Sequence, residues 1–221
     1  MLCYKNGSLA REQIRNEING DKSSDWRRFN SYLLETNVLG SSEGKKLGFY
    51  FPLPEIIPNA PIGTWRFILD KSGVRKADKS DKWTANDDVR AIVESQTLSM
   101  RLRAQPLCPS GKLRHVYFVG GASQNSAIVS VMSQVLGSQD GMYRLTEGLT
   151  AGACARGSAI KAAWAYHGRG MDFEQFFRKR WNTEGQLENV DIDENRNVWE
   201  EYGSVLDAYS QCEEIILSDK R

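Results

Sequence analysis

Two adjacent glycines, Gly120 and Gly121, are the residues of this sequence best placed to bring the backbone close to a ligand. Residues 116–119 before them are apolar, aromatic or β-branched, which predicts a buried strand. Apolar residues recur at helical spacing over residues 128–135, and Gly137 stands where a helix C-cap is expected. Because glycine has no Cβ, this strand, turn and helix can present backbone N–H groups to a phosphate or a sugar.

Ala122 and Asn125 continue the same turn. The side chain of asparagine has both donors and an acceptor, which suits a ribose hydroxyl or an adenine edge. The same side chain at the start of a helix can instead cap the backbone, and the residues alone leave both roles open. The turn has no G-x-G-x-x-G pattern and the chain has no P-loop, so a plain tight β–α connection is the competing interpretation.

The sequence contains few residues suited to nucleophilic catalysis, acid–base catalysis or metal binding. The chain has two histidines, His115 and His167, and neither lies near a G-x-S-x-G nucleophile motif. The cysteines are too far apart for a C-x-x-C metal pattern and are expected to be reduced core residues: Cys3, Cys108, Cys154 and Cys212. The sequence therefore predicts no metal site and no catalytic residue, and reduced thiols favour a cytoplasmic location.

Composition narrows the class of protein. Lys and Arg number 29 and Asp and Glu 28 among 221 residues, whereas proteins that bind nucleic acid usually have a basic excess. No run approaches the ~20 apolar residues that a membrane helix needs, and the first residues have no signal-peptide pattern. We expect neither a nucleic-acid partner nor a membrane partner.

The remaining pattern predicts one α/β domain of short strands separated by helices. Strands are expected at residues 47–51, 64–69, 116–119 and 143–145, and helices at 8–19, from Asp25, from Asn86 or Asp87, and at 151–166. Residues 70–83 are polar and are expected to form a solvated connection. Two aromatic stripes in the last 50 or so residues favour packing over a cofactor site.

Several motifs resemble one family. "VGGASQNSAIVSVMSQVLG" resembles the nucleotide motif in the C-terminal domain of the FGGY carbohydrate kinases, and "TAGACARGSAIKAAWA" resembles the helix that follows it. "MLCYKNGSLAREQIRNEI", "LGFYFPLPEIIP" and "VRAIVESQTLSMRLRA" are similar to the xylulokinase branch of that family, especially its fungal members. The resemblance runs from residue 1 to about 166 and continues weakly into the tail. It departs at Arg156, where the family usually has leucine.

This resemblance implies a fold: an RNase-H-like second lobe of the actin/Hsp70/sugar-kinase architecture. The lobe would be incomplete, with residues 1–221 forming a C-terminal FGGY domain fragment that lacks the N-terminal lobe. Sheet edges and apolar faces left uncovered would then promote self-association.

The resemblance also implies a function. Family members of this branch transfer the γ-phosphoryl group of ATP to D-xylulose with the help of Mg²⁺ and an aspartate base from the first lobe. It places ATP at Gly120, Gly121, Ala122 and Asn125, and predicts that this chain binds xylulose and performs catalysis only together with that lobe. A non-catalytic binding module derived from a sugar kinase is the alternative, and another actin-like ATPase, such as a chaperone, is a third.

Overall fold

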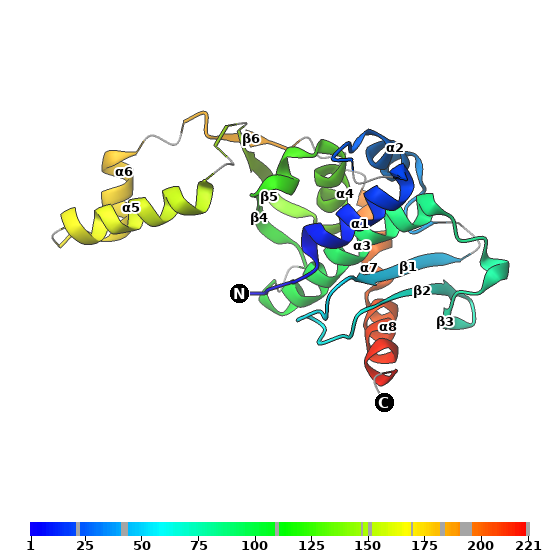
Figure 1. Cartoon of the computed structure of the whole chain (residues 1–221). Coiled ribbons are helices and arrows are strands. Elements are labelled where there is room, and N and C mark those ends of the chain that lie inside the picture. The colour runs from blue at the N-terminus through cyan, green and yellow to red at the C-terminus, as the bar shows by residue number, and fades with distance from the viewer. Residues whose placement is uncertain are drawn as a thin grey trace.

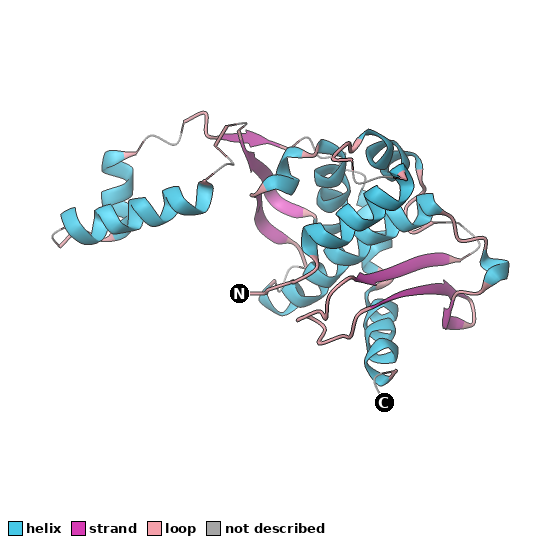
Figure 2. Cartoon of the chain, in the orientation of Figure 1, coloured by secondary structure: helices cyan, strands magenta, loops and turns pink. Residues whose placement is uncertain are grey.

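The computed structural model describes residues 1–20, 23–40, 44–108, 111–146, 148–149, 152–168, 170–181, 184–190 and 196–219. Within them helices lie between and around two small sheets (Figures 1 and 2). The chain is therefore α/β, as the sequence predicts.

The first sheet has three antiparallel strands in the order β1-β2-β3. These are β1 (Lys45–Phe51), β2 (Gly63–Asp70) and β3 (Gly73–Lys76). Leu47 lies opposite Phe67, and both are buried. The rings of Phe49 and Phe67 meet edge to face with centroids 5.8 Å apart, a geometry that aromatic pairs favour. One side of this sheet is therefore an aromatic part of the core.

The second sheet has the order β4-β5-β6. Its strands are β4 (Leu113–Phe118), β5 (Ser138–Leu145) and β6 (Leu187–Asn189). β4 and β5 are parallel, so they need a crossover, which helix α4 (Ser126–Leu136) supplies. Val116, Phe118 and Met142 of the two strands form one buried cluster. On β4 and β5, Tyr117 and Tyr143 stack on each other, and Tyr117 stays 54% exposed.

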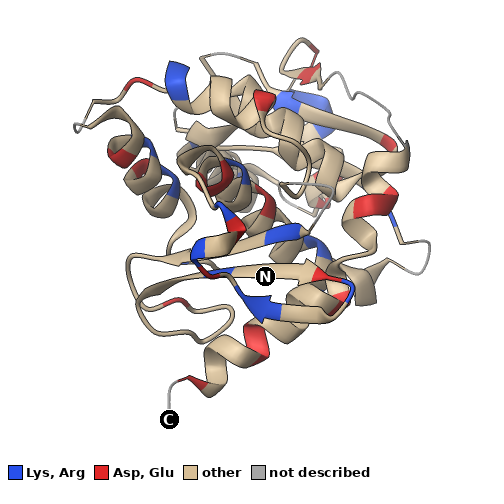
Figure 3. Cartoon of the chain, turned by 90° about the vertical axis from the view of Figure 1, so that its right-hand side faces the viewer, with Lys and Arg blue, Asp and Glu red and all other residues tan. Residues whose placement is uncertain are grey.

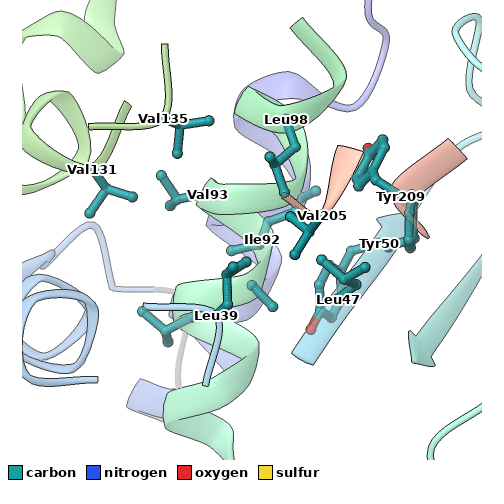
Figure 4. Packing of buried hydrophobic residues seen from close by; sticks show 14 of the residues in the cluster. Leu39, Leu47, Tyr50, Ile92, Val93, Leu98, Val131, Val135, Val205 and Tyr209 are labelled. Atoms are coloured by element: carbon teal, nitrogen blue, oxygen red, sulfur yellow. The ribbon is translucent and has the colours of Figure 1, made fainter. Parts of the chain in front are cut away.

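Helix α3 (Ala85–Ala104) is the centre of the molecule and contacts β1, α4, α8 (Leu206–Ser218), α1 (Gly7–Asn19) and α2 (Arg27–Glu35). Figure 4 shows Ile92, Val93 and Leu98 of α3 among side chains from both sides. The helix begins with a capping box: Thr84 Oγ1 accepts from Asp87 N, and Thr84 N donates to Asp87 Oδ2. Because α3 is covered on several sides, many of its 20 residues are buried.

Helices α5 (Ala153–His167) and α6 (Phe173–Arg180) pack on each other and project away from the other elements (Figure 1). Trp164 joins them, since its Nε1 donates to the carbonyl of Met171 and its ring meets Phe173 edge to face. None of residues 153–167, all of which the structure describes, is buried. We call these two helices the α5–α6 arm.

The remaining elements are α7 (Arg196–Gly203) and the short 3₁₀ turns η1 (Lys79–Asp81), η2 (Gln105–Leu107) and η3 (Gly121–Gln124). Several details of the sequence interpretation were wrong. Helix α2 begins at Arg27 with Trp26 as its N-cap, after the expected Asp25, and β5 begins at Ser138, before the expected residue 143. Residues 70–83 contain strand β3 and η1, and the cap of α3 is Thr84, before the expected Asn86 or Asp87. β3 was missed because a charged edge strand is held by pairing with β2, which composition does not reveal.

Charge is mixed along the surface. Figure 3 shows basic and acidic residues interspersed on the same elements, with neither sign gathered on one face. Among the described residues no helix is long and apolar enough to cross a membrane. The four cysteines are free, but the expected core position is wrong for Cys3 and Cys154, which are exposed; Cys108 is half-buried and Cys212 is buried.

Candidate functional site

The turn after β4 has the backbone geometry that its glycines allow. Gly120 has φ 94° and ψ −179°, a conformation that residues with a Cβ rarely adopt. Gly121 begins η3, and a Cβ built there would meet no described atom within 4 Å. Packing within the chain thus does not explain a glycine at position 121. Open space there leaves the backbone accessible to something outside the chain.

Asn125 is the N-cap of α4. Its Oδ1 accepts from the backbone N–H groups of Ala127 at 3.1 Å and Ile128 at 3.2 Å, while its Nδ2 donates to Asn30 Oδ1 at 2.8 Å. An amide oxygen has two lone pairs and an amide nitrogen two N–H groups, so one N–H donor remains. Asn125 can therefore cap the helix and still donate one hydrogen bond to a ligand.

Gly121, Ala122 and Asn125 line one side of a hollow of about 930 Å³ between α1, α2 and α4, which we call the α1–α4 hollow. This volume is within the ~300–1,000 Å³ typical of small-molecule sites. The start of α4 adds the positive end of a helix dipole, which favours anions. The sequence-predicted residues 121, 122 and 125 thus meet at one concave site, whereas Gly120 is not part of its lining.

The opposite side comes from α1 and the start of α2, about 100 residues earlier in the chain. Arg11 and Arg15, both buried, and Glu12 line the hollow from α1. Trp26 lines it from the N-cap position of α2, and the guanidinium carbon of Arg15 lies 4.7 Å from the centroid of the indole ring. The site therefore combines an aromatic surface with two cations and one carboxylate.

Trp26, Arg11 and Arg15 are not among the residues that the sequence predicts for the site. A signal was present in the sequence, because helical spacing puts Arg11 and Arg15 on one face with Ala10 and Ile14, a face that the structure shows to be buried. Arginines are almost never fully buried without a partner, so two of them on an otherwise apolar helix face indicate a site.

The other candidate residues lie elsewhere. Arg156 is exposed in the α5–α6 arm, where its Nη2 donates to Gln186 Oε1 at 2.9 Å, and it does not line the hollow. His115 contacts the rings of Tyr117 and Tyr143 on the outer face of the second sheet. Neither His115 nor His167 lines the hollow.

Another hollow, of about 560 Å³, lies beside β2, β3 and η1. Two of its basic residues are already paired, Arg66 with Asp88 at 2.7 Å and Lys76 with Asp219 at 2.6 Å. It contains none of the sequence-predicted residues. The α1–α4 hollow is therefore the better candidate.

Solved structures define the class of fold. The crystal structure of xylulose kinase from Rhodospirillum rubrum matches with a TM-score of 0.65 at 16% identity, over 98% of this chain and 39% of that one. A ligand-bound xylulose kinase from Lactobacillus acidophilus matches with a TM-score of 0.64 at 13% identity, over 97% of this chain and 39% of that one. The chain has the fold of part of a sugar-kinase C-terminal lobe.

Sequence comparison is more specific. Residues 1–166 match the C-terminal domain of the FGGY family of carbohydrate kinases. The xylulose kinase of Schizosaccharomyces pombe is 43% identical over 98% of this chain and 40% of its own length. The D-xylulose kinase A of Aspergillus niger is 40% identical over 96% of this chain and 40% of its own length. The chain belongs to the FGGY family of carbohydrate kinases, and it spans about 40% of the length of these relatives.

Proposed function

We propose that this chain is the nucleotide-binding portion of a xylulose kinase, which converts ATP and D-xylulose to ADP and D-xylulose 5-phosphate. The observation that carries the proposal is the α1–α4 hollow, in which Gly121, Ala122 and Asn125 meet in a chain about 40% identical to named xylulose kinases. D-xylulose would bind only together with the part of the relatives that this chain does not match. We propose the cytoplasm as its compartment, given four free cysteines.

The hollow can hold a nucleotide by three kinds of contact. The indole of Trp26 offers an aromatic face to a purine, and the remaining N–H of Asn125 can donate to a ribose or adenine acceptor. The open backbone at Gly121 lets phosphate oxygens approach the amides at the start of η3.

The described residues do not supply a set of ligands for magnesium. Among the described residues no group of three or more His, Cys, Asp or Glu is arranged to hold a metal ion. The family implies Mg²⁺ with ATP, but these residues do not fit a metal site of their own. The proposed role of this chain, which is to place the nucleotide, involves no step through the metal.

Titration of the 221-residue chain with ATP tests the proposal directly. We expect a Kd of roughly 1 mM, equivalent to about −4 kcal/mol, because one wall of a cleft supplies only part of the contacts. Nuclear magnetic resonance should show shifts that saturate at the amides of Gly121, Ala122 and Asn125. Saturable shifts confined to residues outside the α1–α4 hollow would contradict the assignment.

Asn125→Ser separates the cap from the ligand contact. Serine retains an oxygen that caps α4 about as well as asparagine, but it has no amide N–H to donate. We expect ATP affinity to fall several-fold, since a hydrogen bond is worth about 1 kcal/mol, and stability to fall by about the same amount because the hydrogen bond to Asn30 is also lost. In an assembled enzyme the Michaelis constant for ATP should rise more than that for xylulose.

Asn125→Ala is the matched control, because it also removes the cap and should be less stable than the serine variant by about 1 kcal/mol. Calorimetry and ATP titration of the two variants give the comparison. If the serine variant bound ATP as well as the wild type does, Asn125 would act as a helix cap alone.

We also propose that the isolated chain self-associates. Tyr117 and Val119, at and just after the end of β4, are 54% and 55% exposed, and Tyr166 of the α5–α6 arm is 80% exposed. Among the described strands β4 is an edge of its sheet, and edges with exposed apolar residues tend to pair with another copy. Light scattering should give a mass that rises with concentration; a constant monomer mass across a broad range would refute this.

A further inference from the structure

Arg11 lies where two hollows adjoin. Besides the α1–α4 hollow it lines a smaller one, of about 220 Å³, between the N-terminal segment, β1 and α3. Ala122 lines both as well, whereas Trp26 and Asn125 line only the larger one. Arg11 and Ala122 therefore both lie at the boundary between the two hollows.

A hydrogen bond to helix α3 holds the guanidinium of Arg11 in place. Arg11 is only 9% exposed, and its Nη1 donates to Gln96 Oε1 of α3. Gln96 is fixed in turn, because its Nε2 donates to the carbonyl of Gly7 at 3.0 Å and contacts that of Asn6 at 3.4 Å. A side chain whose orientation is set by a second residue is pre-organised for its own ligand.

No carboxylate neutralises this cation among the residues that the structure describes, where no salt bridge joins Arg11 to an acid within 4.0 Å. Burial lowers the pKa of Arg11, and the nearby charge of Glu12 offsets this only in part. A desolvated charge without a counter-ion is unfavourable unless a ligand supplies the opposite charge.

Two other buried arginines show what a structural role looks like here. Arg90 is 5% exposed and has Glu94 at 2.6 Å. Arg101 is 6% exposed, donates to the carbonyls of Val135 and Trp199, and lies over the Trp199 ring. Arg11 makes one hydrogen bond to a neutral amide, so most of its five donors have no acceptor in the described chain.

Those donors are open to the hollows. Among the described residues, the fully buried side-chain nitrogen and oxygen atoms without a hydrogen-bond partner are Glu94 Oε2 and Glu213 Oε1, and no atom of Arg11 is among them. The unused nitrogens of Arg11 are therefore not fully enclosed, and Arg11 lines the two hollows that Ala122 also lines.

We infer that Arg11 is a phosphate-binding residue that holds the anionic tail of the nucleotide against the Gly121–Ala122 turn. The inference rests on the proposed nucleotide function and deepens it. The planar guanidinium matches two phosphate oxygens at once, and the backbone at Gly121, where a Cβ would meet no described atom within 4 Å, is open to the same ligand. The nucleoside then extends towards Trp26 and Asn125, which line only the larger hollow.

Binding of ATP and adenosine by the 221-residue chain, followed by nuclear magnetic resonance, tests this. Arg11→Gln should weaken ATP binding about tenfold or more, the loss expected for a charge-assisted hydrogen bond, and leave adenosine binding within about twofold. Arg156→Gln is the matched control, since it removes one exposed cation that does not line the hollow. It should change neither ATP affinity nor adenosine affinity. Arg11→Lys keeps the charge but loses the planar guanidinium that can bind two oxygens at once. Its ATP affinity should therefore lie between those of Arg11→Gln and the wild type.

Competition binding to the wild-type chain provides a second test. Inorganic tripolyphosphate should displace ATP but leave adenosine bound. An equal loss of ATP and adenosine affinity in Arg11→Gln, or no competition by tripolyphosphate, would overturn the inference while the nucleotide site stood. If the wild-type chain bound no ATP at all, the proposed function would fail and the role of Arg11 with it.

Discussion

Replacement of Arg90 by alanine is expected to lower the free energy of unfolding by about 3–5 kcal/mol, because it leaves a buried carboxylate without its cation. Arg90 Nε donates to Glu94 Oε1 at 2.6 Å, and its two terminal nitrogens donate to the carbonyl of Leu33 and the hydroxyl of Tyr202. Tyr202 and the amide of Leu39 also donate to Glu94 Oε1. The network joins α2, the following loop, α3 and α7 through one guanidinium.

The charge state of Glu94 decides the size of the loss. Burial raises the pKa of Glu94 above its usual value, while the attraction of Arg90 opposes this shift. Without Arg90 the carboxyl must either stay ionised in the core or take up a proton. A carboxyl whose pKa is higher in the folded state stabilises the fold below its unfolded pKa. That contribution is lost as the pH rises through the folded pKa, so Arg90→Ala should be more harmful at pH 8 than at pH 5.

Urea unfolding followed by tryptophan fluorescence measures the effect, since the chain has six tryptophans. The double variant Arg90→Ala/Glu94→Gln should recover part of the stability and lose the pH dependence, because no charge is left unpaired. Arg27→Ala is the surface control: Arg27 pairs with Asp25 but its side chain is 92% exposed, so stability should be essentially unchanged. A loss below ~1 kcal/mol for Arg90→Ala would show that the network contributes little.

The part of the site that the sequence predicted is the part that is local in the chain. Gly121, Ala122 and Asn125 lie within five residues of one another, so a strand, a turn and a helix suffice to bring them together. The structure adds that the acceptor of Asn125 is used by the helix cap, which leaves only a donor. The local pattern predicted the position of Asn125 and its two possible roles, helix cap and ligand contact. The cap geometry makes these two roles compatible.

The rest of the site depends on packing between distant segments. Arg11 reaches the hollow because α1 packs on α3, where Gln96 orients its guanidinium. The Asn30–Asn125 hydrogen bond spans 95 positions and joins α2 to α4. Neither contact has a sequence signature, because the partners are neutral amides whose pairing depends on the helix arrangement. Two arginines at helical spacing beside Ala10 and Ile14 were the one local clue.

The 221-residue chain by itself is expected to give no turnover of xylulose with Mg-ATP. Phosphoryl transfer requires donor, acceptor, metal and base aligned in one cleft, and most of its catalysis is positioning. Among the described residues that line the α1–α4 hollow, Glu12 is the one carboxylate, and it shares the α1 side with Arg11 and Arg15. Cations on the same wall favour holding a polyphosphate over abstracting a proton from a sugar.

A coupled assay for ADP, with heat-treated chain as the control, measures this. Addition of a second polypeptide that carries the part of the Schizosaccharomyces pombe relative not matched by this chain should restore turnover if the two pieces assemble, because the base and the sugar contacts would then face the nucleotide. A non-catalytic module would bind ATP but stay inactive in that mixture. Turnover by the chain alone would place the base within these residues, and Glu12→Gln, which should then abolish it, would identify Glu12 as that base.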